Sequence, residues 1–188
     1  MPKIAEIEPT PNPNARKFIL KESLSWGVAH SFDSAAEAQA DSLARALFDI
    51  EHVTNVFYVD HWITVTQDGG ADWTALLKLL AVPIREAPAA EDRSEALGAA
   101  GSALLDNPRY TPEEREKLRL ISDLLDERVR PFLQGDGGDL FIVGLEGHEL
   151  HVHYQGACGS CPSSLSGTLA GIESLVHQID PTLEVVPV

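Results

Sequence analysis

A stretch rich in alanine, glycine, proline and serine, from Pro88 to Asn107, divides this chain of 188 residues near its middle. Such a composition is typical of a linker, because it offers little apolar surface for a core. A short helix over residues 94–105 is the alternative. The sequence therefore predicts two small domains, residues 1–87 and 111–188, joined by a linker at residues 88–110.

The first predicted domain alternates segments that have the patterns of strands and of helices. Ser34 is a suitable N-cap for a helix whose apolar side chains recur at helical spacing. Two strand-like runs flank Asp60-His61, which indicates a hairpin. The expected elements are strands at residues 17–20, 28–32, 53–59 and 62–66 and helices at 35–48 and 72–80. This order predicts a small α+β domain with its helices on one face of a sheet.

The second predicted domain begins with Thr111-Pro112-Glu113-Glu114, which has the cap, the proline and the acidic residues of a helix start. Apolar residues then recur at helical spacing as far as Phe132, and a glycine-rich run ends the helix. The remaining expected elements are strands at residues 140–145 and 149–154, a helix from Pro162 and a strand at 183–188. The predicted order is α-β-β-α-β, and the predicted fold class is α+β, with two small α/β-layer domains.

The two cysteines of the chain, Cys158 and Cys161, form a CxxC motif in a glycine-rich turn between a predicted strand and a predicted helix. Two thiolates are half of the ligands that a Cys₄ metal or cluster site needs. Either the pair carries out dithiol chemistry alone, or two chains meet to supply four ligands. The glycines allow backbone N–H groups to approach whatever the sulfurs hold, and the helix dipole that follows stabilises a thiolate.

The charges around this motif favour a ligand role over a nucleophilic one. From Pro131 to Val188 the chain has no lysine or arginine, but it has seven acidic residues. Reactive thiolates are typically stabilised by nearby cations, and here only Arg128 and Arg130 are near in sequence. No aromatic residue directly precedes Cys158, and the elements predicted before it are α-β-β rather than a βαβ unit, which disfavours a thioredoxin-like motif. A thiol–disulfide oxidoreductase and a zinc-bridged dimeric interaction module stay open as alternative functions.

Short motifs in both halves of the chain are typical of one family. In the second half they are Arg130-Pro131, Asp136–Asp139, Gly156–Ser164 and Gly171-Ile172-Glu173. In the first half they are Thr10–Asn14, Lys17-Phe18, Leu47-Phe48, Val56-Phe57 and Ile63–Thr66. Through these motifs both halves resemble the Nfu-type iron–sulfur cluster scaffold and carrier proteins, which combine an Nfu N-terminal domain with a NifU-like C-terminal domain.

The resemblance implies a carrier rather than an enzyme. It implies a homodimer, formed through the C-terminal domain, in which Cys158 and Cys161 of each chain bind one [4Fe-4S] cluster, with a [2Fe-2S] cluster as the alternative. The implied partners are apo iron–sulfur enzymes, which receive the cluster, and the upstream cluster-assembly machinery. The N-terminal domain would help to dock the clients.

Three further features have two interpretations each. His151 and His153 are either additional metal ligands or the polar face of a strand whose alternate residues, Tyr154 among them, point inward. The turn Asp136–Asp139 either tunes the cluster and the dimer or simply ends a helix. The segment Thr10–Asn14 is either a client-binding loop or a rigid turn.

The net charge of −15 argues against nucleic acid as a partner, because binding to it depends on neutralising phosphates, and against an anionic membrane surface. No apolar run approaches the roughly 20 residues that span a bilayer. The first residues, Met-Pro-Lys-Ile-Ala-Glu-Ile-Glu, lack the features of a signal or transit peptide. We therefore expect a cytoplasmic location, where thiols stay reduced.

Overall fold

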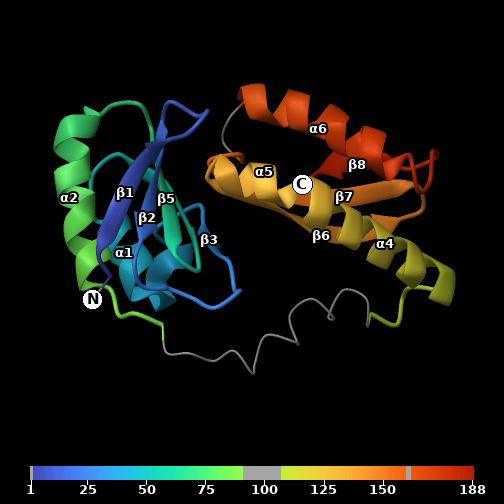
Figure 1. Ribbon diagram of the computed structural model, residues 1–188, viewed down its shortest axis with the longest axis horizontal. Coiled ribbons are helices and arrows are strands. Elements are labelled where there is room, and N and C mark those ends of the chain that lie inside the picture. The colour runs from blue at the N-terminus through green and yellow to red at the C-terminus, as the bar shows by residue number, and fades with distance from the viewer. Residues whose placement is uncertain (1, 91–106, 160–161) are drawn as a thin grey trace. The chain divides into compact units, whose positions relative to one another are not determined.

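The computed structural model describes residues 2–90, 107–159 and 162–188, and the chain divides into two compact units, Met1–Leu97 and Gly98–Val188 (Figure 1). Each unit has its own hydrophobic core and combines helices with a sheet, so the predicted α+β class is confirmed. Most of the segment predicted as a linker, including the alternative helix at residues 94–105, lies outside the described residues. Its described ends pack on the units: Ala90 N donates to Ser23 O at 2.8 Å, and Tyr110 is buried in the second core.

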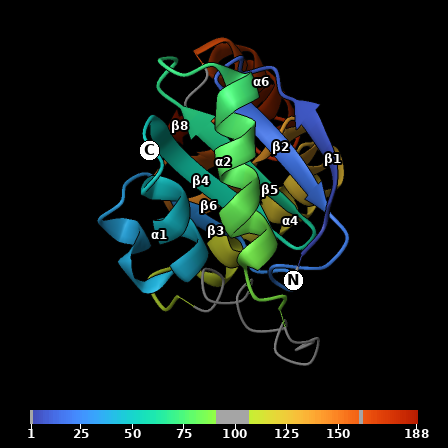
Figure 2. The same cartoon turned by 90° about the vertical axis from the view of Figure 1, so that its left-hand side faces the viewer.

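The N-terminal unit is a five-stranded antiparallel sheet covered on one face by helices (Figure 2). The strand order is β1-β2-β5-β4-β3, so the central strand β5 pairs with β2 and β4. The strands are β1 Ile4–Pro9, β2 Ala15–Leu20, β3 His30–Phe32, β4 Val53–Val59 and β5 Trp62–Gln67. The predicted hairpin of β4 and β5 is confirmed, and Asp60 adopts a positive φ of 47° in its turn.

The helices of this unit depart from the prediction at two places. Instead of one helix at residues 35–48, a short 3₁₀ helix, η1 (Glu37–Ala40), precedes α1 (Ser42–Phe48). Asp41 separates them because its extended backbone and its side chain, which accepts from Ala44 N at 2.7 Å, make it the N-cap of α1. Helix α2 (Trp73–Glu86) is longer than expected and continues past Pro83, because its buried residues hold its last turns against the core.

The turn between β1 and β2 contains the Thr10–Asn14 segment. Asn14 N donates to Asn12 Oδ1 at 3.0 Å, and Ala15 N donates to Asn12 O at 3.0 Å. Asn12 itself is buried, and Trp73 Nε1 donates to Pro13 O at 3.0 Å. These bonds favour the rigid-turn interpretation of this segment over a loop that is free to bind clients.

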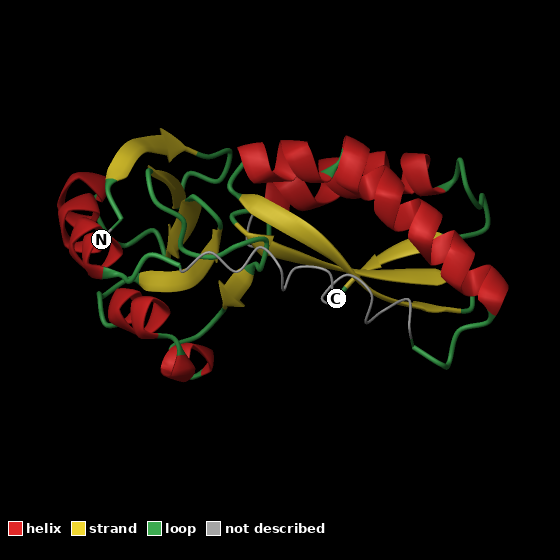
Figure 3. Cartoon of the chain, turned by 60° about the horizontal axis from the view of Figure 1, so that its bottom comes forward, coloured by secondary structure: helices red, strands yellow, loops and turns green. Residues whose placement is uncertain are grey.

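The C-terminal unit is a three-stranded sheet with its helices on one face (Figure 3). Its elements are α4 Pro112–Arg128, α5 Arg130–Gly135, β6 Gly138–Glu146, β7 Glu149–Gly156, α6 Pro162–Val176 and β8 Glu184–Pro187. The predicted order α-β-β-α-β is confirmed, with the first helix divided into α4 and α5. Strands β6 and β7 are antiparallel, whereas β7 and β8 are parallel.

The division of the first helix explains why Phe132 does not lie in the core. The predicted helix continued to Phe132, but α4 ends at Arg128, and α5 starts again with Pro131 in its first turn. Proline has no N–H to donate to the preceding turn, so the helix cannot continue through it without a break. Phe132 is consequently 75% exposed, whereas the next residue, Leu133, is buried in the core.

The parallel pairing of β7 with β8 places a strand–helix–strand unit, β7-α6-β8, around the CxxC motif. The order α-β-β before the motif therefore does not exclude a thioredoxin-like role, because β7, α6 and β8 together form the strand–helix–strand unit that such a role requires. The choice between ligand and nucleophile depends on the immediate surroundings of the cysteines.

Candidate metal centre

The turn between β7 and α6 holds the first predicted ligand, Cys158, which is 2% exposed and belongs to the core of the C-terminal unit. The second predicted ligand, Cys161, lies outside the described residues. Strand β7 ends at Gly156, where the turn begins. The φ of Gly156 is 68°, in the left-handed region that glycine adopts without strain. Gly159 N then donates to Gly156 O at 3.2 Å and tightens the turn around Cys158.

The turn is fixed to the start of β6 as well as to β7. Gly138 pairs with Gly156 in the β6–β7 register, and Ala157 N donates to Gly137 O at 3.1 Å. A Cβ atom added to Gly138 would lie 2.7 Å from Cys158 Sγ and 2.6 Å from Gln155 O. Glycine is therefore required at position 138, because any side chain would displace the cysteine or the backbone of β7. The structure thus gives the Asp136–Asp139 turn a role in placing Cys158, beyond ending a helix.

A buried ion pair anchors this turn from its other side. Asp139, 1% exposed, accepts from Arg130 Nε at 2.8 Å and Nη2 at 3.1 Å, and from its own neighbour Leu140 N at 2.8 Å. Gln134 Nε2 adds a fourth hydrogen bond at 3.2 Å. A bidentate pair of this kind fixes the guanidinium and carboxylate planes relative to each other, and it connects α5 to the first residues of β6.

Arg130 is the cation closest in sequence to the cysteine turn, and two carboxylates already neutralise its charge. It pairs with Asp139 and also with Asp126, at 2.9 Å. Burial lowers the pKa of the Arg130 guanidinium, but the hydrogen bonds to these two carboxylates and their charges outweigh burial and leave the pKa raised. Arg128, the next cation in sequence, is exposed, and its Nε lies 3.9 Å from Glu127 Oε1. Neither arginine is therefore available to stabilise a reactive thiolate at Cys158.

Tyr154 belongs to the same core as Cys158, as the alternation along the strand predicts, and the sequence alone indicates no functional role for it. It is 7% exposed, and its buried hydroxyl has no hydrogen-bond partner within the described part of the chain. Burial, and next the charge of Cys158, raise the pKa of Tyr154 to about 12. A tyrosine at the inward-facing position of the strand, directly before the glycine-rich turn, is the sequence feature that could have identified it.

His151 and His153 lie on the opposite, half-exposed face of β7, as the alternation predicts. His153 Nδ1 is 2.7 Å from the carbonyl oxygen of Val188, and His151 Nε2 is 3.3 Å from a carboxylate oxygen of Glu149. Within residues 2–90, 107–159 and 162–188, no group of three or more His, Cys, Asp or Glu side chains is arranged to hold a metal ion. The two histidines therefore fit the polar face of a strand better than a metal site.

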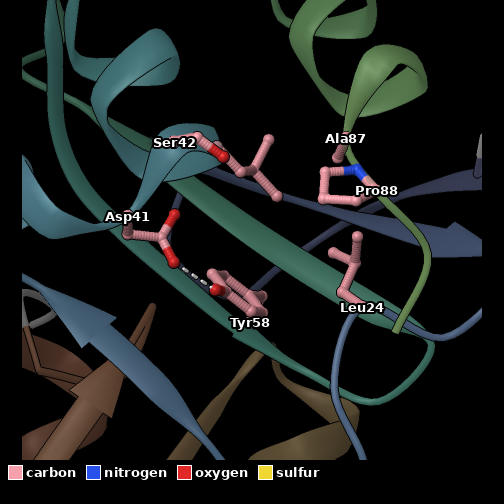
Figure 4. Close-up of a pocket in the computed structure, with 7 residues that line it drawn as sticks. Leu24, Asp41, Ser42, Tyr58, Ala87 and Pro88 are labelled. Atoms are coloured by element: carbon pink, nitrogen blue, oxygen red, sulfur yellow. Dashed lines mark hydrogen bonds between the residues drawn. The ribbon is translucent and has the colours of Figure 1, made fainter. Parts of the chain in front are cut away.

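The N-terminal unit contains a small cavity lined by Asp41 and Tyr58, among other residues (Figure 4). Its volume is about 70 Å³, far below the roughly 300 Å³ of the smallest typical ligand pockets. Its polar groups also bond each other: Tyr58 Oη donates to Asp41 Oδ2 at 2.5 Å, while Asp41 Oδ1 caps α1. His30 stacks on Tyr58 with ring centroids 4.6 Å apart. This cavity belongs to the internal packing of the unit rather than to a cofactor site.

None of the helices in the described part of the chain is both long enough and apolar enough to cross a membrane.

Curated relatives match nearly the whole chain. The proteins named NFU1 iron-sulfur cluster scaffold homolog, mitochondrial, from Drosophila ananassae and Drosophila persimilis are 32% and 31% identical to it over 182 residues, which is 95% of this chain. The chain spans 62% of the length of each of these relatives.

Two solved structures show a weaker similarity. The crystal structure of protein SAV1430 from Staphylococcus aureus has 26% sequence identity and a TM-score of 0.39, over 43% of this chain and 96% of that chain. The solution structure of SeR13 from Staphylococcus epidermidis has 29% identity and a TM-score of 0.35, over 46% and 99%. At these TM-scores the structural similarity supports no conclusion about this chain.

The names of the relatives correct one expectation. They are called mitochondrial, which points to mitochondria rather than the cytoplasm, so the cytoplasmic location expected from the sequence was wrong. The expectation rested on the composition of the first residues. Targeting segments, however, are addresses that receptors read, and the folded domains that follow them do not report the compartment.

Two family models match the chain, one in each unit. Residues 4–89 match the model described as scaffold protein Nfu/NifU N terminal, and residues 121–186 match the NifU-like domain. The second match contains the glycine-clamped turn, both cysteines and the Arg130–Asp139 pair. Because the two models occur in the expected order and the relatives align across both, the chain belongs to the Nfu-type iron–sulfur cluster scaffold family.

Proposed function

We propose that this protein is an iron–sulfur cluster carrier that binds a [4Fe-4S] cluster through Cys158 and Cys161 and delivers it to apo-proteins. The observation that carries the proposal is the position of Cys158. Its thiol is buried in a glycine-clamped turn of a domain that matches the NifU-like family over residues 121–186, a range that includes both cysteines. The cluster is cargo, so the protein has no chemical step of its own and is not an enzyme.

The surroundings of Cys158 favour a ligand over a nucleophile. A nucleophilic thiolate is typically stabilised by a nearby cation, whereas Arg130 is committed to Asp139 and Asp126. A thiolate that binds iron does not need such a cation, because the metal itself stabilises the deprotonated form.

The number of cysteines argues for a shared cluster. A [4Fe-4S] cluster takes four thiolates, and each chain has two cysteines, so two C-terminal units would hold one cluster between them. A cluster at such an interface can leave by ligand exchange, in which thiolates of a client replace those of the carrier one at a time. A [2Fe-2S] cluster is the alternative cargo with the same ligand set.

We further propose that the N-terminal unit docks the apo-proteins and that upstream assembly machinery supplies the cluster. On α2, Leu79 and Val82 are 56% and 54% exposed and one helical turn apart, which makes a small apolar patch. Substituting serine at both positions should slow cluster transfer to an apo-protein without changing the iron content. An unchanged transfer rate would place client docking elsewhere.

Anaerobic reconstitution with iron and sulfide tests the central proposal. The measurements are iron, acid-labile sulfide and oligomeric mass of the full chain. A dimer with about two irons and two sulfides per chain corresponds to one shared [4Fe-4S] cluster. A stable cluster on a strictly monomeric protein would contradict the proposal.

Variants separate this function from its two rivals. Cys158→Ala and Cys161→Ala should each abolish cluster binding, whereas His151→Gln and His153→Gln serve as controls that retain it. A dithiol oxidoreductase would instead stay active as an iron-free monomer. A zinc-bridged module would contain about half a zinc per chain, no labile sulfide, and would lose its dimer on chelation.

A further inference from the structure

The hydroxyl group of Tyr154 is buried in the core of the C-terminal unit and has no hydrogen-bond partner among the residues that the structure describes. Buried polar groups are almost always hydrogen-bonded, and one that is not destabilises the folded state. The other tyrosine of this core shows the usual situation. The Tyr110 hydroxyl accepts from Arg109 Nη2 at 2.6 Å and from Leu145 N at 3.1 Å. A phenylalanine would fill the apolar site of Tyr154 without an unpartnered hydroxyl, so the oxygen requires an explanation.

The position of Tyr154 relates its hydroxyl to the cysteine turn. Its side chain and Cys158 belong to the same core cluster, and its backbone is in contact with the turn. The carbonyl oxygen of Tyr154 lies 3.0 Å from the point where a Cβ on Gly159 would be. A phenol O–H is a hydrogen-bond donor, and the sulfurs of a cluster are acceptors whose hydrogen bonds tune it.

We propose that Tyr154 is a cluster-contact residue, whose hydroxyl donates a hydrogen bond to a sulfur of the cluster held at Cys158. This inference rests on the proposed carrier function and adds a residue that tunes how firmly the cargo is held. Hydrogen bonds to cluster sulfurs stabilise the more negative, reduced state and raise the reduction potential. They also orient the ligands of a metal site and increase its affinity.

The test compares Tyr154→Phe with a matched control, Tyr110→Phe, in the full-length protein. Both changes remove a single oxygen from a core tyrosine of the same unit. Without cluster, Tyr154→Phe should leave the urea midpoint unchanged or raise it, because it removes an unpartnered group, whereas Tyr110→Phe should lower it. A comparable loss of stability in both variants would show that the Tyr154 hydroxyl has a partner within the protein and would overturn the proposal.

With cluster bound, both variants should contain as much iron and sulfide as the wild type. Tyr154→Phe should lose its cluster to an iron chelator roughly ten-fold faster, the factor expected for one hydrogen bond to a charged acceptor, and its reduction potential should fall. Tyr110→Phe should match the wild type in both measurements. Equal chelation rates and potentials for all three proteins would overturn this proposal alone. A wild-type protein that binds no cluster would overturn the carrier function together with it.

Discussion

Tyr58 in the N-terminal unit and Tyr154 in the C-terminal unit are equivalent in burial but not in bonding. Each is an inward-facing residue of a strand, and they are 5% and 7% exposed. The hydroxyl of Tyr58 donates to Asp41 at 2.5 Å, so the N-terminal unit satisfies it internally. The hydroxyl of Tyr154 has no hydrogen-bond partner in residues 107–159 and 162–188 as described, and it lies in the unit that contains the cysteines. Burial alone therefore does not distinguish the two tyrosines, whereas their hydrogen bonding does, and the proposed cluster contact rests on that difference.

The two units can be followed separately in one experiment. All three tryptophans, Trp26, Trp62 and Trp73, lie in the N-terminal unit, so tryptophan fluorescence reports its unfolding. Far-UV circular dichroism reports both units. A change that affects the cysteine turn should therefore shift the circular dichroism transition and the cluster content while the fluorescence transition stays in place.

The largest expected effect is that of Asp139→Ala. The change leaves the Arg130 guanidinium without the buried carboxylate that accepts two of its hydrogen bonds, which should cost about 3 kcal/mol of C-terminal stability. The fluorescence transition should not move, and the cluster should be retained poorly because the turn is released. Asp126→Ala is the control, since its carboxylate pairs with the same arginine at the surface and should cost less than about 1 kcal/mol. Equal losses would show that the buried pair does not anchor the turn.

Gly138→Ala should have the next largest effect. The added methyl group would lie 2.6 Å from a backbone oxygen of β7 and 2.7 Å from Cys158 Sγ, and the backbone cannot rotate away. We expect a loss of about 2 kcal/mol, the usual cost of overpacking, together with reduced iron content after reconstitution.

The control for this change is Gly171→Ala. Gly171 lies on an exposed position of α6 with nothing within 4 Å of an added Cβ, and alanine there should stabilise the helix by up to about 1 kcal/mol. If both alanine variants bind a full complement of iron, the close approach at Gly138 is not needed to place Cys158.

Tyr58→Phe tests the other half of the comparison. It removes the hydrogen bond to Asp41 and should destabilise the N-terminal unit by about 1.5 kcal/mol, visible as a lower midpoint in the fluorescence transition. Iron content, chelation rate and reduction potential should all equal those of the wild type. A slower or faster loss of cluster in this variant would mean that the N-terminal unit takes part in holding the cargo.

Local patterns in the sequence predicted the elements that local interactions form. The helix start at Thr111 is a full capping box, with Glu114 N donating to Thr111 Oγ1 at 3.2 Å and Thr111 N donating to a Glu114 carboxylate oxygen at 2.7 Å. Strand β1 was missed because most of its side chains are exposed and it pairs only with β2 at the sheet edge, so it lacks an apolar alternation.

The parts of the candidate site that the sequence did not predict depend on contacts between elements. The CxxC motif and the glycine-rich turn can be recognised in the sequence. The close approach of Gly138 to Cys158, where an added Cβ would lie 2.7 Å from Sγ, depends on the β6–β7 register. The pairing of Arg130 with Asp139 likewise depends on the break between α4 and α5. The absence of a partner for Tyr154 is a property of the whole core, and no spacing rule reports it.

The smallest expected effect is a pH dependence confined to the C-terminal unit. Asp180 accepts from Lys117 Nζ at 2.5 Å and from Thr182, and these hydrogen bonds, that of Lys117 above all, lower its pKa well below the ordinary value. A carboxylate whose pKa is lower in the folded than in the unfolded chain contributes its full stability above about pH 4, the unfolded value, and loses it as the pH falls further. The urea midpoint of the wild type, followed by circular dichroism, should therefore exceed that of Asp180→Asn at pH 6, and the difference should shrink at about pH 3. The fluorescence transition should be the same in both proteins at each pH, because Asp180 and its partners all lie in the C-terminal unit. A difference that persists unchanged at the lower pH would mean that asparagine destabilises the unit through its shape rather than through the lost charge. The ion pair between α4 and the turn before β8 would then not stabilise the C-terminal unit.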